Sequence, residues 1–201
     1  MRDDKNLTMP LSSKLGLIFL ASEVLLTLTR RSRSKTGTKQ DRSTLGMIWV
    51  VIALSIAAGI FVASSAFLWT AGLWMFELPP GPAVAVAAVV LFATGLLLRW
   101  WAIVTLGRFF TVDVTIETDH ELVERGPFRW VRHPSYTGVL LAFVGWAVTL
   151  WNCVAMAVVL VPIFVAFVRR MNVEEEALAR ALGERYVEYM KRTKRLVPGI
   201  Y

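Results

Sequence analysis

Apolar residues dominate four long stretches of this chain, and polar residues gather between them. The stretches cover residues 15–29, 45–69, 82–106 and 138–168. The second and third are long enough to cross a hydrocarbon core of about 30 Å, and the run Pro79-Pro80-Gly81-Pro82 breaks the chain between them. The first is short and is interrupted by Glu23, so it is the weakest candidate. We expect it to be a retained first helix rather than a removed signal peptide.

The fourth stretch predicts a helical hairpin. As one helix its 31 residues would extend about 46 Å, well beyond the bilayer core. A break near Trp151-Asn152 gives two helices of about 15 residues, slightly short for upright crossings. Basic residues crowd the loop at 30–42 and the segment after residue 168, which places both in the cytoplasm. Because an even number of crossings must separate Arg108 from Arg169, the charge pattern also favours the hairpin.

The expected fold is therefore an all-α integral membrane protein with about five transmembrane helices. The last two form the tight helical hairpin, the N-terminus lies outside, and a cytoplasmic C-terminal helix completes a site at that face. Residues 173–190 are amphipathic, which predicts a helix that lies along the interface or caps the bundle. Residues 111–116 predict a locally extended connection.

Composition supports lipid as the main solvent of this chain. Of its 201 residues 56% are hydrophobic, more than an ordinary globular domain contains. The net charge of +7 lies in segments that flank the apolar runs, which indicates topology and contact with anionic lipid, not nucleic acid. The single Cys153 excludes an internal disulfide. No metal-binding, Walker or Gly-rich dinucleotide motif is present, so we expect no metal site and no Rossmann-type site.

A first polar cluster, residues 126–138, lies between the third and fourth apolar stretches. His133 precedes Pro134, so its backbone is held extended and a helix should begin at Pro134 or Ser135. The free N–H groups of such a helix start attract a carboxylate, and Phe128 and Tyr136 can stack on a planar ring. On these residues alone the cluster anchors a helix end at lipid headgroups equally well.

A second polar cluster, residues 170–176, follows the last apolar stretch. Arg170 and Glu174 are four residues apart, so they share one face of a helix and can pair. The alternative is a solvated run of charges on an interfacial helix. Asp113 and His120 are, by position, ordinary loop residues.

The two clusters together resemble a known family. The runs Leu122-Val123, Gly126-Pro127-Phe128 and Arg132-His133-Pro134-Ser135-Tyr136-Thr137-Gly138 are similar to the signature of the isoprenylcysteine carboxyl methyltransferase family, within the broader group of membrane phospholipid methyltransferases. Arg170-x-x-x-Glu174-Glu175 and the later Tyr186, Tyr189 and Pro198 add to the resemblance, which covers residues 99–198. It implies N-terminal transmembrane helices at 1–98 and a methyltransferase-like catalytic region at 99–201, in one membrane domain.

The resemblance also implies which residues form the site. The cofactor, S-adenosyl-L-methionine, would be bound by His120, Leu122, Val123, Phe128, His133, Pro134, Ser135, Tyr136 and Glu174. Glu174 would hold its ribose or amino group, and Arg170 would act as the catalytic and substrate-binding residue that faces a substrate carboxylate. Phe128 stands where eukaryotic members often have Tyr, so stacking is retained and a hydroxyl contact is lost. Asp113 lies near a polar cofactor contact of the family.

The chemistry agrees with the absence of an obvious catalytic dyad. A carboxylate is already a nucleophile at neutral pH, so the enzyme needs mainly to align the reactants and exclude water. We therefore predict methyl transfer to a lipid or prenylated small-molecule or protein acceptor, with the active site on the cytoplasmic face of the membrane. A phospholipid N-methyltransferase is the main alternative, and its amine acceptor would need a base such as Glu175 or His133. An NADPH-dependent sterol-type reductase, which usually has more helices, and a non-catalytic membrane module are further alternatives.

Overall fold

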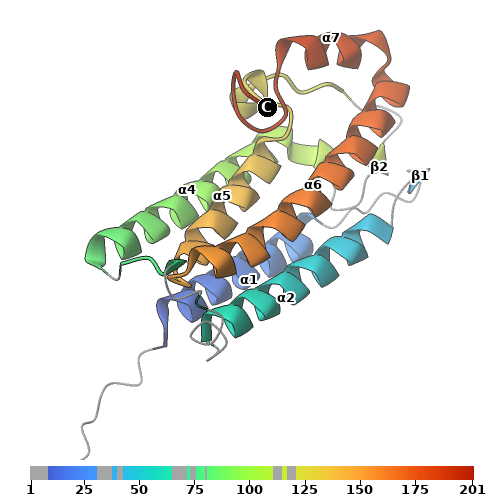
Figure 1. Ribbon diagram of the computed structural model, residues 1–201. Coiled ribbons are helices and arrows are strands. Elements are labelled where there is room, and N and C mark those ends of the chain that lie inside the picture. The colour runs from blue at the N-terminus through green and yellow to red at the C-terminus, as the bar shows by residue number, and fades with distance from the viewer. Residues whose placement is uncertain are drawn as a thin grey trace, which may run out of the picture.

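The computed structural model describes residues 9–30, 38–39, 43–64, 72, 76–79, 81–110, 115–116 and 121–201. His120 and Asp113 lie outside these residues. The described part is mainly helical (Figure 1). Its helices are α1 (Leu11–Arg30), α2 (Ser43–Ser64), α4 (Pro82–Leu106), α5 (Pro134–Val148), α6 (Cys153–Leu182) and α7 (Glu184–Arg192), with 3₁₀ turns η2 (Gly107–Phe109) and η3 (Gly126–Arg129). Strands β1 (Thr38–Lys39) and β2 (Thr115–Ile116) form one short antiparallel pair, so local extension is present in the described part of the predicted segment 111–116.

Four described helices are long and apolar enough to cross a membrane. The spans are Leu11–Thr29, Gly46–Ser64, Pro82–Phe109 and Cys153–Leu182, and α5 is an apolar helix of 15 residues. Large apolar side chains face outward, such as Leu28, Phe61 and Leu97, which are 66–76% exposed. The predicted helical membrane architecture is thus confirmed at this level. The weakest candidate stretch forms a full helix of 20 residues, α1.

The predicted break near Trp151-Asn152 is present. Helix α5 ends at Val148, Trp151 has a φ of 58°, and the Asn152 side chain accepts a hydrogen bond from the Ala155 backbone N–H at 3.0 Å. That bond caps the first turn of α6. The Leu78 N–H also donates to the Trp151 carbonyl at 2.7 Å. The hairpin tip and the segment before α4 therefore lie at the same end of the bundle.

Small residues bring α4 and α5 close together. A Cβ added at Gly138 would lie 2.5 Å from the backbone nitrogen of Arg99, and one at Gly145 would lie 2.5 Å from that of Phe92. Such close backbone approach is a common way of packing helices in membranes. Helix α2 lies along α6, and buried side chains of α5 and α6, including Val139, Phe143 and Ile163, fill the centre.

The C-terminal tail differs from the single amphipathic helix predicted at 173–190. Helix α6 continues from the apolar stretch through the second polar cluster to Leu182, because no breaking residue intervenes. Gly183, with a φ of 59°, then ends it, and α7 lies across the end of the bundle (Figure 1). Gly commonly stops helices in this left-handed conformation. Arg170 and Glu174 therefore belong to the same continuous helix, α6, as the second half of the last apolar stretch.

Candidate active site

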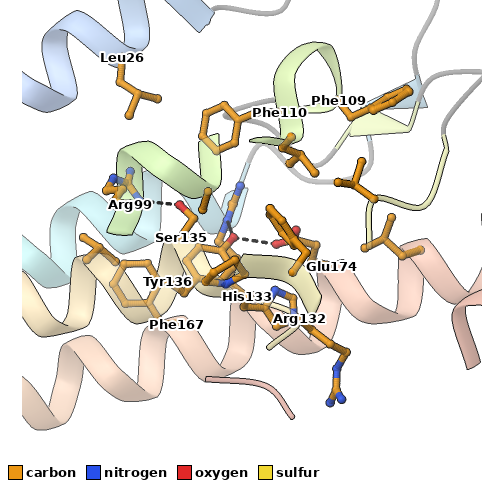
Figure 2. A pocket seen from close by; sticks show the side chains of 18 of the residues that line it. Leu26, Arg99, Phe109, Phe110, Arg132, His133, Ser135, Tyr136, Phe167 and Glu174 are labelled. Atoms are coloured by element: carbon orange, nitrogen blue, oxygen red, sulfur yellow. Dashed lines mark hydrogen bonds between the residues drawn. The ribbon is translucent and has the colours of Figure 1, made fainter. Parts of the chain in front are cut away.

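The structure brings the two polar clusters together in one pocket. Every predicted cofactor residue that it describes lines this pocket: Leu122, Val123, Phe128, His133, Pro134, Ser135, Tyr136 and Glu174. Arg170 lines it as well. Helix α5 begins at Pro134 as predicted, so its first turn and the polar part of α6 face one space (Figure 2).

Tyr136 joins the two charged residues of the second cluster. Nε of Arg170 donates to the Tyr136 Oη at 3.0 Å. The Tyr136 hydroxyl donates in turn to Oε2 of Glu174 at 2.7 Å (Figure 2). The Tyr136 ring packs against Phe167, with centroids 5.2 Å apart. The spacing of four residues predicted a shared helix face on which Arg170 and Glu174 can pair, and in the structure the Tyr136 hydroxyl from the other cluster contacts both side chains. Both side chains are thereby held at the pocket wall.

Glu175 faces another group of residues. Its carboxylate accepts hydrogen bonds from Nε of Arg132 at 2.9 Å and from Nη2 of Arg195 at 2.6 Å. Nε2 of His133 lies 3.0 Å from the same carboxylate. The Glu175 side chain is only 8% exposed, so this is a buried ion network. The His133 ring borders the pocket while its Nε2 is engaged by Glu175.

The C-terminal segment completes this network. Backbone N–H groups of Arg132 and His133 donate to the carbonyls of Lys194 and Arg195, at 2.8 and 3.0 Å. Burial opposes the charge of Arg195, but its hydrogen bonds with Glu175 and Tyr201 outweigh burial and raise its pKa. The guanidinium therefore stays charged. Sequence reasoning missed this residue, since one Arg in a basic tail carries no signal of its partner.

Helix α7 contributes two buried tyrosines. The Tyr189 hydroxyl donates to the Phe128 carbonyl at 2.6 Å, and burial raises the pKa of Tyr189 to about 12, so the hydroxyl remains a donor. Tyr186 lines the pocket and is 2% exposed. Within the described part of the chain its hydroxyl has no hydrogen-bond partner. Because a buried polar atom is rarely left unpaired, Tyr186 is a candidate ligand-binding residue that its place in the motif alone did not single out.

An ion pair lines the pocket where it extends between the apolar helices. Arg99 of α4 donates from Nε and Nη2 to the two carboxylate oxygens of Glu23 of α1, both at 2.8 Å. Nη1 of Arg99 also donates to Oγ of Ser135 at 3.2 Å (Figure 2). In the sequence, Glu23 stands out only as an interruption of an apolar run. An ionisable residue in such a run was the available signal for a site.

The geometry defines a helical membrane protein in which two polar motifs, one before and one after an apolar hairpin, meet in a pocket at one end of the bundle. Among the described residues, no group of three or more His, Cys, Asp or Glu side chains is arranged to hold a metal. Residues 86–180 match the sequence model of the isoprenylcysteine carboxyl methyltransferase (ICMT) family. Over this segment, just under half of the chain, the sequence is similar to that family.

Individual relatives agree with the family match. Protein-S-isoprenylcysteine O-methyltransferase B of Arabidopsis thaliana is 39% identical over 106 residues, which are 52% of this chain and 54% of that protein. The Saccharomyces cerevisiae protein-S-isoprenylcysteine O-methyltransferase is 31% identical over 117 residues, 57% of this chain and 49% of that protein. The chain thus spans about half the length of these curated relatives.

A solved structure of the eukaryotic intramembrane Ras methyltransferase ICMT has the same fold. It superposes with a TM-score of 0.64 at 21% sequence identity, and the match covers 96% of this chain and 70% of that one. The structural match therefore extends to the N-terminal helices that lie before the segment matched by the family.

Proposed function

We propose that this protein is an S-adenosylmethionine-dependent membrane methyltransferase that esterifies the carboxylate of a prenylated cysteine. The observation that carries the proposal is the hydrogen-bonded chain Arg170–Tyr136–Glu174, which joins both family motifs in one pocket. The relatives named protein-S-isoprenylcysteine O-methyltransferase support this choice of acceptor.

The residues of the pocket fit the cofactor. S-Adenosylmethionine, when bound, supplies an electrophilic methyl group on a positively charged sulfur. Glu174 offers a carboxylate for the ribose or amino group, and the unpartnered hydroxyl of Tyr186 offers a second buried polar contact among the described residues. Phe128 and Tyr136 supply aromatic faces. A mostly apolar pocket with a few convergent polar groups is typical of a small-molecule site.

The chain's own residues would bind and orient the acceptor. Arg170 is 5% exposed, so its guanidinium acts in a water-poor environment where attraction to a carboxylate is strong. The bond from its Nε to Tyr136 fixes the orientation of the guanidinium. A carboxylate needs no deprotonation before it attacks, so alignment and exclusion of water are the main requirements.

We further propose that all five apolar helices cross the membrane, with the pocket on the cytoplasmic face and α7 at that surface. The basic residues of α7 and of the tail support this orientation. The hairpin tip and the segment 77–78, which contact each other, would then face the opposite side. The division into N-terminal helices at 1–98 and a catalytic region at 99–201 stays a prediction of the sequence.

The first test is calorimetric titration of S-adenosylmethionine into the purified full chain in nanodiscs. Glu174→Gln should abolish or strongly weaken binding. Glu176→Gln is the matched control, since Glu176 lies on the same helix with its side chain 71% exposed and outside the pocket. Labelled methyl transfer to an S-prenyl-N-acetylcysteine would identify the acceptor. Binding of NADPH in place of the cofactor, or methylation of phosphatidylethanolamine alone, would contradict the proposal.

A further inference from the structure

The ion pair between Glu23 and Arg99 occupies an unusual place. It joins α1 to α4 within two apolar helices, and both side chains line the candidate active site. The two side chains are 10–11% exposed. Charges at membrane depth are costly and commonly mark functional sites, while a helix contact alone is made with less cost by neutral polar groups.

The neighbouring residue on each helix shows such a neutral contact. Nε1 of Trp100 donates to Oγ of Ser22 at 2.8 Å, so it also fastens α1 to α4. Neither residue is among the described residues that line the pocket. The two helices are therefore already joined by a polar contact that needs no charge. Helix packing alone therefore does not explain why a charged pair lines the pocket.

The guanidinium of Arg99 retains hydrogen-bonding capacity. Of its five N–H groups, three bind described residues: two bind Glu23 and one binds Ser135. Since Glu23 neutralises its charge, the pair as a whole attracts a second carboxylate weakly. A neutral carbonyl oxygen can accept a hydrogen bond from it without adding charge to this part of the pocket.

The position of the pair relates it to the acceptor. Ser135, which Arg99 contacts, directly precedes Tyr136, which contacts Arg170. On the other side, the apolar side chains of Phe19, Leu26 and Ile48 continue the pocket wall. Arg99 therefore lies between the group proposed to bind the acceptor carboxylate and the apolar helices.

Resting on the function proposed above, we propose that the Glu23–Arg99 pair binds a neutral carbonyl oxygen close to the acceptor carboxylate. The pair thereby selects lipid acceptors that carry an amide beside the carboxylate over lipid acids that lack one. It is a specificity-determining element of the acceptor site contributed by α1 and α4. Glu23 lies outside the segment matched by the family.

Two acceptors with the same prenyl chain test this proposal: S-prenyl-N-acetylcysteine, and S-prenyl-3-mercaptopropionate, which lacks the acetamido group. Dissociation constants are measured with the full chain in nanodiscs without cofactor, and KM is measured with it. The wild type should bind the amide acceptor about tenfold more tightly, as expected for a hydrogen bond to a charged donor. Glu23→Gln and Arg99→Lys should remove this preference, and both variants should still bind S-adenosylmethionine.

Ser22→Ala is the matched control, because it weakens the α1–α4 contact outside the pocket. It should lower the melting temperature without changing the preference between acceptors. If the single charge variants do not fold, the double variant Glu23→Arg, Arg99→Glu restores an ion pair and moves the guanidinium. It should regain stability without the amide preference.

The outcomes separate this proposal from the function it rests on. Methylation of both acceptors with equal affinity would overturn the role of the pair and leave the proposed function standing. Retention of the preference in the charge variants, or its equal loss in Ser22→Ala, would also overturn it. Failure of the wild type to bind either acceptor while it binds the cofactor would overturn the proposed acceptor class, and the role of the pair with it.

Discussion

Three consecutive glutamates on α6 should respond to neutralisation in three different ways, and Glu175 gives the sharpest test. Its side chain is 8% exposed and engages Arg132, His133 and Arg195. Removing one partner of a buried ion pair costs about 3–5 kcal/mol. Arg195 is 25% exposed and keeps access to water. We therefore expect Glu175→Gln to destabilise the fold by about 3 kcal/mol, at the lower end of that range.

Arg132 also keeps other partners, which supports this lower figure. Its Nη1 donates to the carbonyls of Met190 and Thr193. In a chain of this size about 3 kcal/mol corresponds to a fall in melting temperature of roughly 6–12 °C. Thermal unfolding in nanodiscs, followed by intrinsic fluorescence, measures it. Part of the loss should come from release of the C-terminal segment that Arg195 anchors.

The two neighbours provide the comparison. Glu176, whose side chain is 71% exposed, pairs with Arg180 at 3.5 Å, and such a surface pair contributes about 0–1 kcal/mol. Glu176→Gln should therefore melt close to the wild type. Glu174→Gln should also melt close to the wild type but lose cofactor binding. If Glu175→Gln melts within about 2 °C of Glu176→Gln, a shift worth under 1 kcal/mol, the buried network does not hold the fold together as argued.

Three further predictions concern packing and the tyrosines of α7. Gly145→Ala should destabilise the fold by about 1–3 kcal/mol, because the added Cβ would lie 2.5 Å from the backbone of α4. Gly46→Ala is the control: its Cβ meets no described atom within 4 Å, so it should stabilise the helix by up to about 1 kcal/mol. Thermal unfolding compares the two variants. Tyr186→Phe should leave the melting temperature unchanged or raise it, because the buried hydroxyl has no described partner. The same variant should weaken cofactor binding measured by calorimetry. Unchanged affinity would show that Tyr186 is not part of the cofactor site. Burial raises the pKa of Tyr189 from 10.0 to about 12, so its contribution to stability is complete below pH 10 and is lost as the pH rises through 12. Tyr189→Phe, which lacks the bond to Phe128, should lose less stability than the wild type between pH 9 and 12, and equal losses would contradict the assignment.

Local chemistry explains which features the sequence could predict. Pro82 and Gly107 bound α4, and its predicted limits are those observed, because proline and glycine act on the backbone directly. Pro134 begins α5 for the same reason. The convergence of the two clusters could be predicted from charge, because the pattern of basic residues assigns both clusters to the same face of the membrane. Gly183 was a readable stop signal, and it divides the tail that we predicted as one helix.

Contacts between distant helices were not available from the sequence. The pairing of Glu23 with Arg99 depends on α1 lying beside α4, and hydrophobic periodicity does not say which helices are neighbours. The same holds for Arg195, which meets Glu175 only because the tail folds back along residues 131–133. The Arg170–Tyr136–Glu174 chain likewise needs the two clusters to be placed in three dimensions.

Glu174 and Glu175 face different surroundings, and this difference bears on which acceptor the site can use. Successive residues on a helix point about 100° apart, so one carboxylate faces the pocket and the other faces the tail. An amine acceptor must lose a proton, and Glu175 and His133 were the candidate bases. In the structure each engages the other, and two guanidinium groups also bind Glu175. The Glu175 carboxylate and Nε2 of His133 are thus directed at protein partners, while the His133 ring still borders the pocket. A carboxylate acceptor makes no such demand, so the engagement of Glu175 by protein partners agrees with the ester formation that we propose.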